Sequence, residues 1–168
     1  MSDTCQKKIP LPLVLLDNIP TVLMYILGSL LILRISFIGG FIFAVYTIST
    51  FFWFWYLICP WCPLFGTRIC PCGYGKISSL LTIRRTEGVF RKHFGKFILY
   101  VFPAWFVPFG LGVFSLILRW SLPYLVLLCV FSIDGFLIIP LVSRIRGCKD
   151  CPVRSECPWM SQQKKQSS

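Results

Sequence analysis

Four long apolar stretches dominate this chain and leave it few ways to fold. They run from about Ile19 to Ile35, Ser36 to Ile58, Phe97 to Leu118 and Leu122 to Val142. Each approaches the roughly 20 residues that a helix needs to cross a bilayer. Hydrophobic residues make up 56% of the 168 residues and charged residues only 14%, which is too much apolar surface for so small a body to hide from water. The sequence therefore predicts an all-α integral membrane protein with four transmembrane helices.

Very short connections join the spans in pairs, near Arg34–Gly40 and near Arg119–Pro123. Such connections are typical of tight helical hairpins. We therefore expect two tandem hairpins, each followed by a cysteine-rich knuckle, in a single membrane domain over residues 1–168. Its parts are hairpin 1 with the first cysteines (1–75), a basic loop with interfacial helices (76–96), hairpin 2 with the second cysteines (97–160) and a polar tail (161–168).

The distribution of Lys and Arg predicts the orientation in the membrane. If the N-terminus is cytoplasmic, only Arg34 and Arg119 fall on the outer side. The other 15 of the 17 basic residues fall on the inner side: Lys7, Lys8, Arg68, Lys76, Arg84, Arg85, Arg91, Lys92, Lys96, Arg144, Arg146, Lys149, Arg154, Lys164 and Lys165. Cytoplasmic loops carry such an excess. We expect both termini to be cytoplasmic in a cytoplasmic or inner membrane, with the basic loops on anionic lipids rather than on nucleic acid.

Seven of the nine cysteines form two tight groups, each directly after a pair of spans. The first cysteine cluster has the pattern C-x2-C-x7-C-x-C and comprises Cys59, Cys62, Cys70 and Cys72. The second cysteine cluster has the pattern C-x2-C-x5-C and comprises Cys148, Cys151 and Cys157. Both begin C-x2-C-P and both reach a later C-P. We interpret the chain as a weak internal repeat of hairpin plus cysteine knuckle.

This spacing is typical of metal sites. A C-x2-C turn points two thiolates at one centre, and a second close pair can complete a tetrahedron. The cytoplasm keeps thiols reduced, so a disulfide framework is not expected there. The first cluster has four thiols, whereas the second has three, and its missing ligand could be Cys5, His93, water or a residue of a partner. The seven clustered cysteines are the predicted metal ligands.

The cysteine pattern is compatible with two kinds of metal site, an iron–sulfur cluster and a zinc site. Zinc accepts all-sulfur tetrahedral sites. Iron–sulfur clusters also take four thiolates, and C-P steps occur in bacterial ferredoxins. Five of the nine cysteines precede a proline: Cys59, Cys62, Cys70, Cys151 and Cys157. The glycines of Cys72-Gly73-Tyr74-Gly75 are expected to relieve the backbone around the first site.

The step Cys70-Pro71-Cys72 resembles the C-P-C step of heavy-metal P-type ATPases. The resemblance covers three residues and implies a carrier or sensor of soft metal ions. In those pumps the step lies within the membrane, whereas here Arg68 and Lys76 flank it. A carrier would need Asp134 and Cys129 to line a path through the spans.

Asp134 lies in the middle of the fourth predicted span. An ionisable residue is costly there, so a functional role is the default hypothesis, either as a proton relay or as a cation ligand. The alternative is a neutral, hydrogen-bonded Asp134 that packs helices together with the help of Gly135.

The residues expected of common enzymes are scarce. The chain has one His and six acidic residues, and it lacks the glycine-rich nucleotide-binding motifs and the G-x-S-x-G motif. We do not expect an autonomous enzyme. The sequence favours a membrane-anchored electron-transfer or accessory subunit, with a protein partner or a second copy at its cytoplasmic face. The alternatives are the soft-metal carrier and a structural zinc scaffold.

Overall fold

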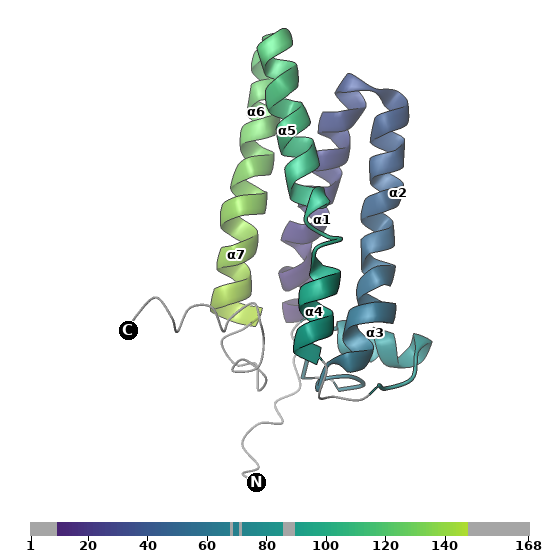
Figure 1. Ribbon diagram of the computed structural model, residues 1–168. Coiled ribbons are helices and arrows are strands. Elements are labelled where there is room, and N and C mark those ends of the chain that lie inside the picture. The colour runs from purple at the N-terminus through teal and green to yellow at the C-terminus, as the bar shows by residue number, and fades with distance from the viewer. Residues whose placement is uncertain (1–9, 68, 71, 86–89, 148–168) are drawn as a thin grey trace, which may run out of the picture. The chain divides into compact units, whose positions relative to one another are not determined.

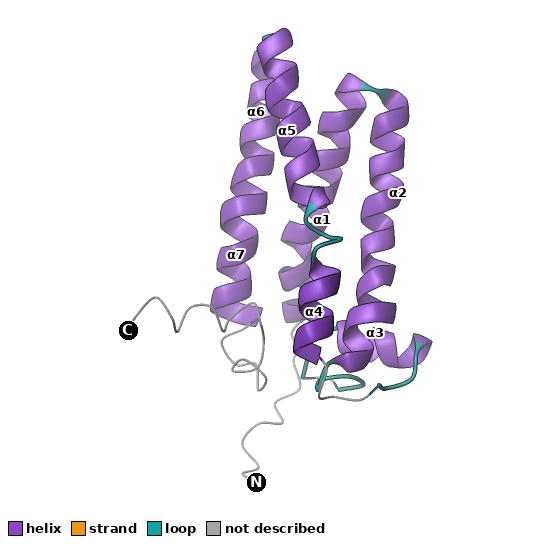
Figure 2. Ribbon diagram, in the orientation of Figure 1, coloured by secondary structure: helices purple, strands orange, loops and turns teal. Residues whose placement is uncertain are grey.

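The computed structural model describes residues 10–67, 69–70, 72–85 and 90–147, with only the backbone for residues 90–93, 146 and 147. Throughout these residues the regular structure is helical, with no strand (Figure 2). Figure 1 labels the seven α-helices: α1 (Leu11–Ile35), α2 (Phe37–Trp53), α3 (Tyr74–Leu81), α4 (Phe90–Ile98), α5 (Pro103–Leu118), α6 (Leu122–Ile133) and α7 (Ile139–Val142).

Four helical segments are long and apolar enough to cross a membrane: Leu11–Ile35, Phe37–Trp61, Phe94–Leu118 and Leu122–Ile145. In the most apolar 18-residue stretch of each segment, only 22–33% of the residues are buried inside the protein. Many of the other apolar side chains are exposed, among them Phe37 and Ile117 with 77% and 76% of their surfaces exposed. Lipid is the solvent that such a surface requires. Within the described residues the predicted helical fold is confirmed, and four helices long and apolar enough to span a bilayer suggest an integral membrane protein.

Helix boundaries differ from the predicted spans at two places. The first helix begins at Leu11 rather than near Ile19, because Pro12 falls in its first turn, where a missing N–H costs nothing. The third span is not α-helical at residues 99–102, just before Pro103, whose nitrogen cannot donate a hydrogen bond. The Tyr46 hydroxyl donates to the Tyr100 carbonyl in this break. A backbone acceptor in lipid needs such a partner.

Contacts within the chain divide it into two compact units. Unit 1 consists of the described residues within Met1–Asp17, Phe52–Ile98 and Val142–Ser168, and it contains the first cysteine cluster. Unit 2 consists of Asn18–Phe51 and Leu99–Leu141, and it contains the greater part of each membrane span.

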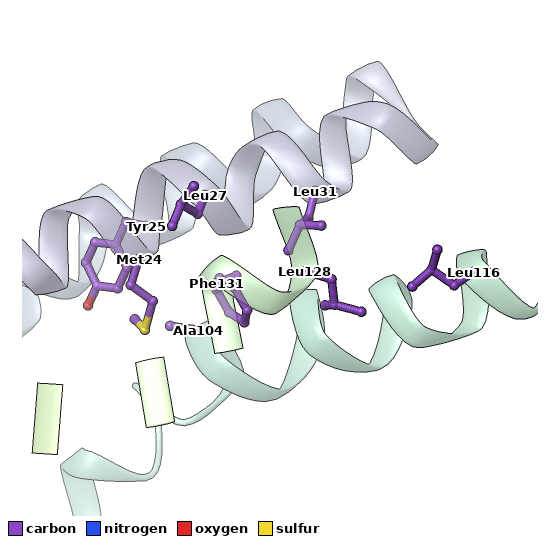
Figure 3. Close-up of a cluster of buried hydrophobic side chains, with 8 residues drawn as sticks. All are labelled: Met24, Tyr25, Leu27, Leu31, Ala104, Leu116, Leu128 and Phe131. Carbon is purple, nitrogen blue, oxygen red and sulfur yellow. The ribbon is translucent and has the colours of Figure 1, made fainter. Parts of the chain in front are cut away.

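Unit 2 is held together by an apolar core drawn from α1, α5 and α6. Figure 3 shows its buried side chains, which are Met24, Tyr25, Leu27, Leu31, Ala104, Leu116, Leu128 and Phe131. Glycines allow the close packing around this core. A Cβ atom on Gly28 would lie 3.0 Å from the Phe43 ring and 3.3 Å from the Phe131 ring. Small residues at such contacts let membrane helices approach one another.

Several hydroxyl groups within unit 2 bond to one another or to the backbone. The Tyr25 hydroxyl lies 2.9 Å from Thr50 Oγ1, which links α1 to α2. The Tyr124 hydroxyl donates to the Leu31 carbonyl at 3.2 Å, which links α6 to α1. Hydrogen bonds of this kind hold transmembrane helices together. Whether the spans act as two tandem hairpins with equivalent knuckles stays a prediction.

Candidate metal centre

The first C-x2-C motif forms a tight turn at the end of the second span. The α2 helix continues as a π-helical turn, Phe54–Ile58, and then as a single 3-10 turn, Cys59–Trp61. The Cys62 amide donates to the Cys59 carbonyl at 3.0 Å, which closes this turn. Pro60 suits the position, because the first residues of a helix have no backbone partner for their amides. Cys59 is buried and Cys62 is half-buried.

The second cysteine pair of this cluster lies on another turn. The Gly73 amide donates to the Cys70 carbonyl at 3.0 Å, so Cys70 and Cys72 belong to one turn that leads into α3. Gly73 has a φ of +73°, a left-handed conformation that side chains other than glycine's rarely tolerate. Both cysteines are half-buried. The chain thus presents two short turns, each with two thiols.

Gly75 lets these two turns approach each other. A Cβ atom at this position would lie 2.5 Å from the Leu64 carbonyl oxygen and 3.3 Å from Cys70 Cβ. The Gly66 amide donates to the Gly75 carbonyl at 3.0 Å and ties the two arms of the loop together. The helix α3, which directly follows the second cysteine turn, contacts the first turn, Cys59–Trp61. The two cysteine-bearing segments are therefore neighbours in unit 1.

Further contacts fasten this loop to the end of the second span. The buried Ser78 hydroxyl donates to the Trp55 carbonyl at 2.6 Å. The Arg85 amide donates to the Pro60 carbonyl at 2.9 Å, and the Arg85 guanidinium carbon lies 5.5 Å from the centre of the Trp61 ring. That ring contact is a cation–π interaction. Trp61 lies within the C-x2-C motif, so the loop and the motif are held as one piece.

Aromatic residues at the end of the second span pack on the neighbouring helices of unit 1. Tyr74 of α3 contacts the rings of Phe54 and Trp55, with ring centres 6.0 and 6.4 Å away. Trp53 makes an edge-to-face contact with Phe97 at 6.5 Å. These contacts position α3, and with it the turn that carries Cys70 and Cys72.

The described part of the chain contains no group of three or more His, Cys, Asp or Glu side chains arranged to hold a metal ion. Cys59, Cys62, Cys70 and Cys72 are thiols rather than disulfides in the structure. Their chemistry and grouping suit a soft metal, whereas the closed four-sulfur arrangement stays a prediction.

The second cysteine cluster lies outside the described residues, as do Cys5 and the side chain of His93. The helix that leads to this cluster is described, and it ends in a π-helical turn, Ser143–Gly147. Cys148 follows this turn directly, as Cys59 follows the π-helical turn Phe54–Ile58. The two five-residue segments, FWYLI and SRIRG, share no sequence pattern that predicts this similarity.

The two residues proposed to line a carrier path differ in exposure. Cys129 is exposed on the surface of α6, whereas Asp134 is buried. Asp134 begins a third π-helical turn, Asp134–Ile138, within the fourth span. The carrier path stays a prediction.

No protein-family model, curated protein or solved structure matches this chain. The functional interpretation rests on the residues of the site.

Proposed function

We propose that this chain is a membrane-anchored metal-binding protein and that its cysteine thiolates hold an iron–sulfur cluster or zinc at the cytoplasmic face of the membrane. The observation that carries the proposal is the meeting of two cysteine turns in unit 1. Cys59 and Cys62 lie on one turn, and Cys70 and Cys72 lie on the other. Gly75 allows the second turn to approach the loop that follows the first.

The donor set fits these metals. Four thiols on two turns supply the number and type of ligand that zinc and iron–sulfur clusters accept. Metal binding would bring the two turns closer together. It can do so because the free energy of metal binding in such small sites is also free energy of folding. Structural zinc in zinc-finger peptides contributes about 10–16 kcal/mol, far more than closing one short loop requires.

The proposal includes both halves of the chain. In each half, a membrane span ends in a π-helical turn that is followed at once by a C-x2-C-P motif. This supports a repeated unit of hairpin and cysteine knuckle. Fifteen basic residues fall on one predicted side of the membrane and two on the other. Because such an excess is typical of the cytoplasmic side, we propose that both clusters lie there. There the thiols stay reduced and available to metal.

We further propose that the protein is an electron-transfer or accessory subunit of a membrane complex. Two metal sites fixed at one membrane face could pass electrons between a soluble partner and the membrane if they hold iron–sulfur clusters. If they hold zinc, which has no redox chemistry, the same sites serve as a scaffold for assembly. The basic loops would recruit anionic lipid or an acidic partner.

Paired substitutions test which residues hold the metal. We expect the Cys59→Ser, Cys62→Ser protein to lose the metal of the first site, and the Cys148→Ser, Cys151→Ser protein to lose that of the second. Cys129→Ser is the matched control, because Cys129 is exposed on α6 and belongs to neither cluster. Metal per chain is measured by elemental mass spectrometry after purification without oxygen, and circular dichroism verifies that the helices remain. Full metal content in both paired variants would refute this assignment.

A further inference from the structure

Asp134 is a buried acid in the membrane part of the protein, and the metal sites do not use it. It is 2% exposed, and its Oδ2 atom is buried with no hydrogen-bond partner. It is the only acidic residue of unit 2. Helical geometry puts it about 18 Å along the fourth span from Leu122, near the middle of the bilayer.

The backbone around Asp134 is unusual as well. The residue begins the π-helical turn Asp134–Ile138, and such turns are frequent at functional sites. The Trp105 indole N–H donates to the carbonyl of the next residue, Gly135, at 3.2 Å. A Cβ atom on Gly135 would lie 3.3 Å from Trp105 Cδ1 and 3.4 Å from Met24 Sδ. Gly135 thus packs the helices closely, while the nearest side chains beside it are an indole and a thioether.

Asp134 Oδ2 has no hydrogen-bond partner among the other titratable groups of unit 2, which include four tyrosines. Hydroxyls of three of them are engaged elsewhere: Tyr25 with Thr50, Tyr46 with the Tyr100 carbonyl, and Tyr124 with the Leu31 carbonyl. The fourth is Tyr100. Cys129 is exposed, and Ser132 next to Asp134 donates to Leu128 of its own helix at 2.7 Å. The two positive charges of the unit lie at helix ends, with Arg34 in the last turn of α1 and Arg119 just after α5.

These facts distinguish the two explanations left open for Asp134. A helix-packing carboxyl would satisfy its buried oxygen with a partner on another helix, and Oδ2 has none within the described residues. A permanently charged carboxylate without a counter-ion is strongly disfavoured at this depth. A cation site would need several oxygen ligands around the ion, and Asp134 belongs to no group of three or more His, Cys, Asp or Glu side chains within the described residues.

We infer that Asp134 is a proton-binding site within the membrane part of the protein. It takes one proton from the aqueous phase, forms one O–H bond at Oδ2 and leaves the carboxyl neutral. The proton is exchangeable, because no interhelical hydrogen bond holds it. This inference does not depend on metal at the cysteine clusters.

Dicyclohexylcarbodiimide, an apolar reagent that reacts with protonated carboxyls, tests the inference on the full chain in membranes. An exposed Asp is neutral in only about one molecule in a thousand at neutral pH, so we expect at least about tenfold more adduct on Asp134 than on exposed acids. Peptide mass spectrometry locates the adducts. Labelling of Asp134 should fall reversibly as the pH is raised, because the ionised form does not react.

Three variants complete this test. Asp134→Asn should lose the adduct, Asp134→Glu should retain it, and Asp17→Asn should leave labelling of Asp134 unchanged. Circular dichroism of each variant verifies that the helices remain. Absence of an adduct on Asp134 in the folded protein at neutral pH would overturn the inference. Labelling that does not change as the pH is raised would also overturn it.

Discussion

Replacing Gly75 by valine is expected to abolish metal binding at the first cysteine cluster. The new Cβ atom would lie 2.5 Å from the Leu64 carbonyl oxygen, closer than folded proteins allow. That oxygen belongs to the backbone, so relief requires the loop to move rather than a side chain to rotate. The same Cβ atom would press on Cys70, 3.3 Å away. Separating the two turns removes the arrangement that four thiolates need around one metal.

Gly95→Val is the matched control for Gly75→Val. Both glycines lie in short helices of unit 1, and a Cβ atom on Gly95 would meet nothing within 4 Å. The change in helix propensity, from glycine to valine, is therefore similar in the two variants, while the steric conflict occurs in one. Metal per chain and the rate of thiol alkylation are measured for both. Equal metal content in the two variants would show that close approach at Gly75 is not required for the site.

Replacing Gly40 by leucine is expected to disrupt the packing of α1 against α2. A Cβ atom on Gly40 would lie 2.7 Å from Leu33 Cα and 2.8 Å from Leu33 Cβ. Overpacking of this kind costs about 1–3 kcal/mol, and more where backbone must move. We expect the variant to unfold at a clearly lower temperature in detergent, followed by circular dichroism.

Gly110→Leu is the matched control for Gly40→Leu. It places the same side chain in a membrane helix of the same unit, at a position with nothing within 4 Å. Its unfolding temperature should stay near that of the unmodified protein. If both leucine variants unfold at the same temperature, the contact at Gly40 does not determine the stability of unit 2.

The spans were predictable because a bilayer requires a fixed length of apolar helix. The predicted end of the first span at Ile35 agrees with α1, and the predicted second span, Ser36–Ile58, covers α2 and the π-helical turn that follows it. Apolar content alone could not predict the break at residues 99–102. That break depends on Pro103 and on the Tyr46 hydroxyl, which reaches it from another helix.

The cysteine spacing predicted a turn at the first C-x2-C motif, and the structure contains a turn at Cys59–Cys62. It could not predict how this segment packs against the turn that carries Cys70 and Cys72, because that contact depends on Gly75 and the Leu64 carbonyl, which are 11 residues apart in the chain. The mid-span position of Asp134 was likewise plain from the sequence. The unpartnered Oδ2 atom depends on the side chains of other helices and required the structure.

Metal analysis of the unmodified protein tests the central claim most directly. The protein would be purified in detergent without oxygen, and bound metal and sulfide per chain would be measured together with the visible and electron paramagnetic resonance spectra. We predict stoichiometric metal, either iron with sulfide and a signal on reduction, or zinc in a colourless sample. Iron–sulfur supports electron transfer, and zinc supports the scaffold. Protein with intact helices and reduced thiols but no bound metal would contradict the proposed function.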